Sequence, residues 1–181
     1  MSQKVLHQEF FNRKTETVAK ELLGKFLIRR VGDSEITALI TETEAYIGPH
    51  DKAAHSFKGR TQRTEVMFGH PGVFYIYLCY GIHWMLNIVT REYGYPAAVL
   101  IRGVMVEGKK YNGPGKITKL LQIDKKLNSQ KATPENGLWV EDRGVKVPQK
   151  SISAGPRVGV AYAGPIWAQK PLRFVLKDTP R

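Results

Sequence analysis

The sequence has a single cysteine, Cys79, among its 181 residues. No intrachain disulfide can form, and no cysteine cluster can hold zinc or an iron–sulfur centre. The zinc deaminases, whose signature needs a pair of cysteines, are excluded for the same reason. A chain without disulfides is typical of a reducing compartment, so we expect a cytoplasmic protein.

Long apolar segments are also lacking. The N-terminal residues MSQKVLHQEFFNRK have no apolar stretch of the kind found in signal peptides. The longest apolar run, Val73 to Val89, is interrupted by Gly81, His83 and Asn87 and is too polar to cross a membrane. From these apolar runs we expect no membrane association. Three motifs are also absent: G-x-G-x-x-G, G-x-S-x-G and the P-loop spacing.

Acidic residues are scarce relative to basic ones. The chain has 28 Lys and Arg against 16 Asp and Glu, which gives a formal net charge of +12. Such an excess favours a polyanionic partner, which is either nucleic acid or an anionic membrane surface. Charge alone does not choose between the two.

The expected elements describe an α+β protein. At 181 residues the chain has the length of one domain, residues 1–181, with a real core. The pattern predicts a helix over 16–23, capped by Thr15 and ended by Gly24, and shorter helices over 61–68 and 116–123. Strands are expected over 25–30, 36–43, 73–79, 82–90, 97–106, 137–142, 157–163 and 172–176. Because strands and helices do not alternate regularly, we expect a mostly antiparallel, curved sheet with flanking helices, closing on itself or open.

One expected hairpin is unusually aromatic. The strands 73–79 and 82–90 meet near Tyr80 and Gly81, with Tyr75 and Tyr77 on one face of the first strand. The hairpin is expected to protrude, with Tyr80 at its tip. An exposed aromatic there is either a wedge between base pairs or a platform for an unpaired base. The alternative is that the tyrosines only pack a sheet.

Two acidic residues end the strand over 36–43. Glu42 and Glu44 are two positions apart, so they share a face if the strand continues, and a Gly-Pro loop follows. They either line a cleft or form ion pairs at a solvated strand end. With Asp51 they also allow a third interpretation, a metal-dependent nuclease. His55, in the following loop, taken alone is most simply a surface residue.

Two residues within apolar strands, and one segment at an expected helix start, carry polar groups that need a partner. Asn87 lies in an apolar strand, so its amide either satisfies backbone groups or contacts the edge of a bound base. Arg102 interrupts another apolar strand and needs a carboxylate or phosphate partner. The segment 113–116, G-P-G-K at an expected helix start, could hold a phosphate.

Motifs of one known family follow each other along nearly the whole chain. They are E-A-Y-I-G-P-H-D-K-A-A-H-S at 44–56, M-F at 67–68, P-G-V-F-Y-I-Y-L-C-Y-G at 71–81 with Asn87, L-I-R at 100–102, G-P-G-K-I at 113–117, R-V-G-V at 157–160 and K-P-L-R-F at 170–174. In these motifs and their order the chain resembles the alkyladenine (3-methyladenine) DNA glycosylases. The chain begins almost at the core of the family's domain, as bacterial members do, so we expect it to be most similar to these.

The resemblance implies a catalytic set. Glu44 matches the general base that activates water, and Arg102 and the backbone of Val160 match groups that help hold that water. We expect Glu44 to be ionised with the help of Arg102. The reaction implied is hydrolysis of the N-glycosidic bond, without metal or cofactor and without strand cleavage.

The resemblance also implies how the substrate is bound. Tyr46, His55 and Tyr77 match residues that sandwich a nucleotide base flipped out of the duplex. Asn87 matches the residue that discriminates against the guanine amino group, and Tyr80 matches an intercalating wedge. The implied partner is double-stranded DNA with alkylated or deaminated purines, in base excision repair. The enzyme is expected to be a cytoplasmic monomer that associates with the nucleoid when bound to DNA. The rival hypothesis is a non-catalytic nucleic-acid-binding module, which needs neither Glu44 nor Arg102.

Overall fold

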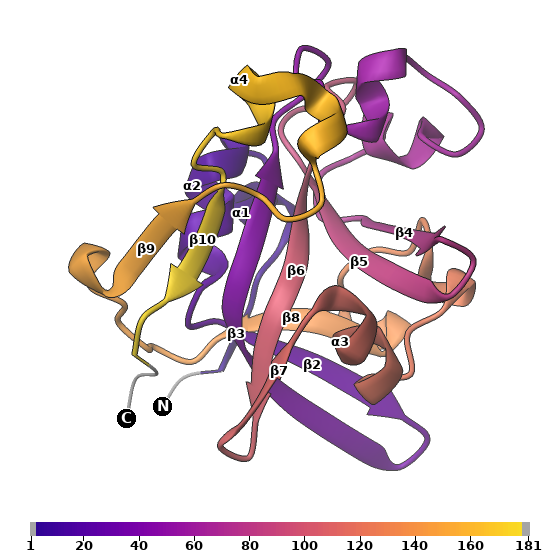
Figure 1. The fold of residues 1–181 in the computed structure, drawn as a ribbon. Helices are drawn as coiled ribbons and strands as arrows, with labels where there is room; N and C mark the ends of the chain where they lie inside the picture. The colour runs from indigo at the N-terminus through magenta and orange to yellow at the C-terminus, as the bar shows by residue number, and fades with distance from the viewer. Residues whose placement is uncertain (1–2, 179–181) are drawn as a thin grey trace.

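The computed structural model describes residues 3–178, which form one antiparallel sheet with short helices around it (Figure 1). The strands are β1 (Lys4–Val5), β2 (Phe26–Val31), β3 (Ser34–Tyr46), β4 (Phe74–Cys79), β5 (His83–Thr90), β6 (Ala97–Val106), β7 (Lys109–Asn112), β8 (Leu138–Asp142), β9 (Ile152–Gly155) and β10 (Arg173–Leu176). The helices are α1 (Gln8–Phe11), α2 (Thr15–Leu22), α3 (Pro114–Leu120) and α4 (Gly164–Ala168). The α+β prediction is confirmed.

Two long strands organise the sheet. One edge of β3 pairs first with β2 and then, over residues 42–44, with β10, while its other edge pairs with β6. The far edge of β6 pairs first with β5 and then with β7. The main path runs β1-β8-β2-β3-β6-β5-β4. Its end strands, β1 and β4, do not pair with each other within residues 3–178, so the sheet is open rather than closed.

The core forms where α2 and α3 cover the sheet. Val18 and Leu22 of α2 are buried against β3 and β6, and Ile117 of α3 is buried against β5 and β6. A buried hydrogen bond from the Thr43 hydroxyl to the Ala19 carbonyl, 2.8 Å long, fixes α2 on β3. This contact lies one residue before Glu44, so the helix anchors the strand end that carries the predicted base.

The start of α2 differs from the predicted cap. Thr15 is the first helical residue and does not cap the helix, because its buried hydroxyl bonds that of Thr90 at 3.0 Å. Gly24 has the left-handed backbone expected of it, with φ +81°. The helix predicted over 116–123 is α3, beginning at Pro114 as its Gly-Pro sequence indicates. The helix predicted over 61–68 is reduced to a short 3₁₀ turn, Glu65–Phe68.

The C-terminal half differs from the predicted strands in two ways, and the end of β3 differs in a third. Residues 157–163 do not form a strand: Gly159 is left-handed with φ +73°, the Arg157 side chain is bonded to Asp51 and Ala45, and a 3₁₀ turn follows at Ala161–Ala163. The strand that pairs with β10 is instead β9, which the pattern did not indicate. β3 also runs on to Tyr46, beyond the predicted end at Thr43, because β6 and β10 pair with its two edges.

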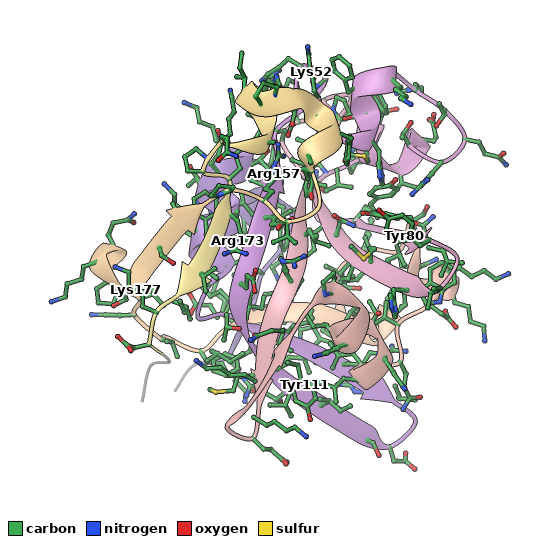
Figure 2. The ribbon with its side chains drawn as sticks, viewed as in Figure 1. Lys52, Tyr80, Tyr111, Arg157, Arg173 and Lys177 are labelled. Carbon is green, nitrogen blue, oxygen red and sulfur yellow. The ribbon has the colours of Figure 1, made fainter. Side chains whose placement is uncertain are left out.

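The aromatic hairpin forms as predicted from β4 and β5, and Figure 2 labels Tyr80 at its tip. Tyr80 is 91% exposed, and it has the uncommon φ of +50° beside Gly81 at +70°. No helix among residues 3–178 is long and apolar enough to cross a membrane.

Candidate active site

A cleft of about 920 Å³ opens beside the ends of β3 and β6. Its floor includes Glu44 and Arg102, and its walls come from the 52–64 loop, the β4–β5 hairpin and the 158–162 loop. A chamber of about 30 Å³ adjoins it and shares Tyr46, His55 and Tyr77 with it. Residues that are far apart in the sequence therefore line one hollow, as the sequence predicts.

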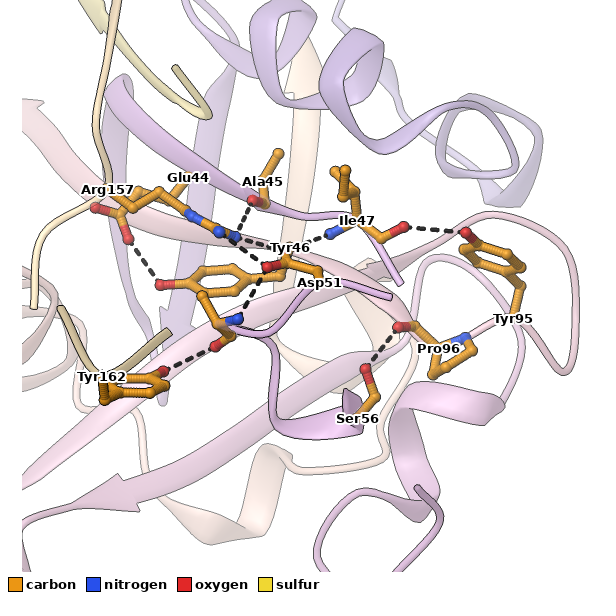
Figure 3. A network of polar contacts seen from close by, with 11 residues as sticks. Glu44, Ala45, Tyr46, Ile47, Asp51, Ser56, Tyr95, Pro96, Arg157 and Tyr162 are labelled. Atoms are coloured by element: carbon orange, nitrogen blue, oxygen red, sulfur yellow. Dashed lines mark hydrogen bonds and ion pairs between the residues drawn. The ribbon is translucent and has the colours of Figure 1, made fainter. Parts of the chain in front are cut away.

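Glu44 is fully buried at the floor of the cleft and is held by two hydrogen bonds, of which Figure 3 shows the one to Tyr46. The Tyr46 hydroxyl donates to Oε2 at 2.9 Å, and the Val158 backbone N–H donates to Oε1 at 2.8 Å. Burial raises the pKa of the Glu44 carboxyl, outweighing the opposite effects of the Val158 hydrogen bond and the Arg102 charge. Arg102 thus favours the ionised form as expected, but less strongly than burial opposes it.

Arg102 lies between two carboxylates. Its Nε is 3.0 Å from Glu42 Oε1 and 3.5 Å from Glu44 Oε1. Arg102 therefore has two carboxylate partners, where the sequence predicted one carboxylate or phosphate. Glu42 and Glu44 share a strand face because β3 continues through both. The contacts are ion pairs rather than well-aligned hydrogen bonds, and Arg102 Nε has no hydrogen-bond partner among residues 3–178. The Arg102 Nε therefore lies beside both carboxylates without a well-aligned hydrogen bond to either.

A buried ion pair fixes the loops around this floor. Arg157 binds Asp51 through two hydrogen bonds, one of them Nη2 to Oδ1 at 2.9 Å, and both side chains are fully buried. Arg157 also donates to the Ala45 carbonyl, and Asp51 accepts from the Ile47 and Ala53 backbone. The pair joins the end of β3 and the 47–53 turn to Arg157 (Figure 3), and so it fixes the loop whose next residue, Val158, contacts Glu44.

An aromatic cluster forms the chamber next to Glu44. The His55 and Tyr77 rings are 4.6 Å apart at 71°, an edge-to-face contact, and His55 Nδ1 is 2.9 Å from the Tyr75 hydroxyl. Burial, with a smaller effect from the Arg63 charge, lowers the pKa of His55 to about 4, so the imidazole is neutral at pH 7. Burial raises the pKa of Tyr46 and Tyr77. His55 is thus a cleft residue, not the surface histidine that its loop position alone suggests.

The chain as a whole matches a known protein family. A family model described as methylpurine-DNA glycosylase matches residues 9–180. The chain belongs to the methylpurine-DNA glycosylase family. It is accordingly an enzyme, a hydrolase of N-glycosyl bonds.

Full-length relatives agree with the family model. The chain is 44% identical to a protein of Methanocella arvoryzae, covering 97% of this chain and 94% of the relative. It is 43% identical to proteins of Myxococcus xanthus (96% of this chain, 91% of the relative) and Legionella pneumophila (97% and 96%). All three carry provisional names as 3-methyladenine DNA glycosylases.

In this glycosylase Asn87 lies against the aromatic chamber. It is buried, and its Nδ2 donates to the Tyr75 carbonyl at 3.1 Å and the Met85 carbonyl at 3.4 Å. Its side chain nevertheless lines the chamber together with His55 and Tyr77. Asn87 therefore satisfies backbone groups, as one of its two interpretations required, and it also lies at the wall of the chamber.

Val160 and Tyr80 contribute differently to the glycosylase cleft. Val160 is buried, packs on Ala53 and lines the cleft, and its carbonyl accepts from the Ala163 N–H. The backbone group that reaches Glu44 is that of Val158, two residues earlier. Tyr80 lines the outer rim of the cleft and does not reach the chamber.

Sequence reasoning missed two side chains of the glycosylase cleft. Tyr162, 69% exposed, lines both hollows and donates its hydroxyl to the Ala53 carbonyl at 2.8 Å (Figure 3). Arg63 lies over the Tyr77 ring, 4.8 Å from its centroid. Tyr162 could have been found from its place two residues after Val160. Arg63 carries no local signal, since it is one of several basic residues in its loop.

The nuclease interpretation does not fit the geometry. Asp51 is bound by Arg157, whereas Glu42 and Glu44 contact Arg102, so the three acids do not converge. Across residues 3–178, no three His, Cys, Asp or Glu residues are grouped as metal ligands.

The G-P-G-K segment, for which the sequence suggested a phosphate site, has a structural contact with the active site. The Gly113 N–H bonds the Arg102 carbonyl at 2.9 Å and so ties α3 to the strand that carries Arg102.

Proposed function

We propose that this enzyme flips alkylated purines out of double-stranded DNA and hydrolyses their N-glycosidic bond, with Glu44 as the general base. The observation that carries the proposal is a fully buried, hydrogen-bonded carboxylate at the floor of a cleft lined by aromatic side chains. A non-catalytic DNA-binding module has no need for such a group, because leaving a carboxylate out of water is unfavourable.

The reaction needs one water and one base. Glu44 takes a proton from the water, whose oxygen bonds to the sugar C1′ while the purine leaves with the electrons of the broken bond. The raised pKa of Glu44 makes it a stronger base than an exposed carboxylate. Arg102 lines the cleft beside Glu44, and its Nε–H makes no well-aligned hydrogen bond within residues 3–178. This supports the proposal that Arg102 helps hold the water, together with the Val160 backbone. The negative charge of ionised Glu44 also stabilises the oxocarbenium-like transition state.

In this proposal the flipped purine is held by Tyr46, His55 and Tyr77. The chamber of about 30 Å³ has room for little more than a water molecule, so the edge-to-face rings of His55 and Tyr77 must separate to admit a purine. N3- and N7-alkylated purines are cationic, and a neutral His55 does not repel them. Asn87, held by two backbone carbonyls, disfavours the guanine amino group, so we expect 3-methyladenine to be released faster than 7-methylguanine.

Tyr80 acts as the wedge. An aromatic that is 91% exposed at a hairpin tip can enter the minor groove and fill the space that the flipped nucleotide leaves. The net charge of +12 supplies the attraction to the phosphates. The proposed enzyme is a monomer that works in the cytoplasm, associated with the nucleoid while it is bound to DNA.

Deaminated purines such as hypoxanthine are the slower substrates in this proposal. A neutral purine leaves readily only if it receives a proton, and the cleft lining within residues 3–178 holds no carboxyl group besides that of Glu44, which already serves as the general base. Release of hypoxanthine is therefore expected to be slower than release of 3-methyladenine.

The test is base release from defined duplexes. The protein is incubated with duplexes carrying 3-methyladenine, 7-methylguanine, ethenoadenine or hypoxanthine, with and without a metal chelator, and alkali then converts abasic sites to strand breaks. We expect breaks only after alkali and no effect of the chelator. Binding without abasic sites would support the DNA-binding module, and breaks before alkali that the chelator prevents would support a nuclease.

A further inference from the structure

Glu42 lies next to the charged floor of the cleft, in contact with Arg102, but has no part in the reaction described above. It is only 12% exposed and contacts two arginines: Arg102 Nε at 3.0 Å and Arg173 Nη1 at 3.7 Å. An acidic residue with so little access to water needs a compensating role or strong pairing. Figure 2 shows Arg173 beside β3, on the side away from β6.

The position of Glu42 is fixed by the backbone. Pairing between β3 and β6 is irregular on both sides of Glu42, which faces Gly103. A Cβ at Gly103 would lie 2.7 Å from the Glu42 Cβ, so glycine is what allows the two strands to approach here. The Glu42 carboxylate is therefore held against β6, next to the guanidinium of Arg102.

Arg102 is nearer to Glu42 than to Glu44. Its Nε is 3.0 Å from the first carboxylate and 3.5 Å from the second, although both are within ion-pair distance. Glu44 already accepts hydrogen bonds from Tyr46 and Val158. A third, direct bond from Arg102 would occupy the carboxylate that has to accept the proton of the attacking water.

We infer that Glu42 is a positioning residue: it holds Arg102 beside Glu44 without letting the guanidinium bond the catalytic carboxylate. The inference rests on the proposed role of Glu44 as general base. Removal of the Glu42 charge frees Arg102 to turn fully onto Glu44. The base then becomes weaker and loses access to water, while the lesion pocket, built from other residues, is unchanged.

The charges around Glu44 give this inference a pH signature. The groups that face it are Tyr46 and Glu42 on its own strand, Arg102 on β6, the Val158 N–H, and, through Glu42, Arg173 on β10. Glu42 raises the pKa of Glu44 by like-charge repulsion, and Arg102 lowers it. Loss of the Glu42 charge removes the first effect and strengthens the second, so both changes lower the pKa of Glu44.

The experiment compares Glu42→Gln with the wild type in single-turnover release of methylated purines. We expect the rate on the neutral plateau to fall roughly tenfold or more, and the acidic limb of the pH–rate profile to move to lower pH. Affinity for lesion DNA should stay within about twofold. The matched control is Glu35→Gln on the same strand, because Glu35 pairs with Arg30 at 3.4 Å in an exposed position outside the cleft, and this variant should behave as wild type.

Glu42→Asp separates charge from shape. It keeps the charge on a shorter side chain, so its acidic limb should stay near that of the wild type even if its rate falls. A Glu42→Gln variant with the wild-type rate and profile would overturn the inference. So would equal rate losses in both variants with no movement of the acidic limb, since that describes a purely structural role. A wild type that releases no base would instead contradict the proposed function.

If Glu42→Gln proves too unstable to assay, the Glu42→Asp variant decides. A reduced rate with unchanged affinity for lesion DNA supports the inference, because the shortened carboxylate can no longer hold Arg102 at 3.0 Å. A wild-type rate, or a loss of affinity as large as the loss of rate, opposes it. Thermal unfolding of every variant shows whether a lower rate reflects a smaller folded fraction.

Discussion

The floor of the cleft and the tip of the hairpin differ in burial and in hydrogen bonding. Glu44 at the floor is fully buried and bonded to the Val158 backbone, and Asp51 and Arg157 form a buried ion pair in the loops around it. At the tip, Tyr80 is 91% exposed. A buried network fixes the geometry that hydrolysis needs, whereas an exposed aromatic has surface free for a partner. The contrast predicts that changes at the floor alter chemistry or stability, and that changes at the tip alter binding alone.

The largest expected effect is that of Glu44→Gln. The amide cannot accept the proton of the attacking water, so base release should fall by about 10³-fold, within the range for loss of a general base. Binding to lesion-containing duplex should stay close to wild type, because the aromatic chamber is unchanged. Single-turnover release and a gel-shift titration measure the two quantities. Wild-type release by this variant would remove Glu44 from the mechanism.

Breaking the buried ion pair should affect folding more than any exposed pair does. Arg157→Met leaves the Asp51 carboxylate buried without its cation, and we expect a loss of about 3–5 kcal/mol in the free energy of unfolding. The matched control is Arg30→Met, whose exposed contact with Glu35 should contribute less than about 1 kcal/mol. Urea unfolding measures both. Equal losses in the two variants would contradict the structural role of the buried pair.

Tyr80→Ser should weaken lesion-DNA binding by about tenfold, since stacking on a base contributes about 1–3 kcal/mol. Stability should not change, because the side chain is almost fully exposed. Tyr93→Ser, an exposed tyrosine outside the cleft, is the control and should bind normally. Fluorescence anisotropy at fixed ionic strength reports the affinities. Equal affinity for wild type and Tyr80→Ser would separate the hairpin tip from DNA binding.

The smallest expected effect is a pH dependence of stability through His55. Its pKa is about 4 in the folded chain and 6.5 unperturbed, so the unfolded state binds more protons between these values. The stability from keeping His55 neutral is complete above pH 6.5 and is lost as the pH falls toward 4. Urea unfolding at pH 7, 5.5 and 4 should show a shallower decline for His55→Gln than for wild type. His83→Gln, which alters an exposed histidine, should follow the wild type.

Local patterns sufficed for much of the fold. The β4–β5 hairpin and the Pro114 helix start follow from alternation and from turn chemistry that adjacent residues supply. The predicted strand over 157–163 failed for the opposite reason. An apolar, β-prone segment was pulled into a turn by the bonds of Arg157 to Asp51, more than a hundred residues away. No local pattern reports such a partner.

The site divides in the same way. Glu44, Arg102 and the aromatic residues can be assigned to one family's motifs from the sequence, because motif order is carried by residue identity alone. The folded chain was needed to find that Glu42 and Glu44 share Arg102, that Val158 reaches Glu44 and that burial favours a neutral His55. Those properties depend on burial and on distances between strands, and folding sets both through contacts between segments that are remote in the chain.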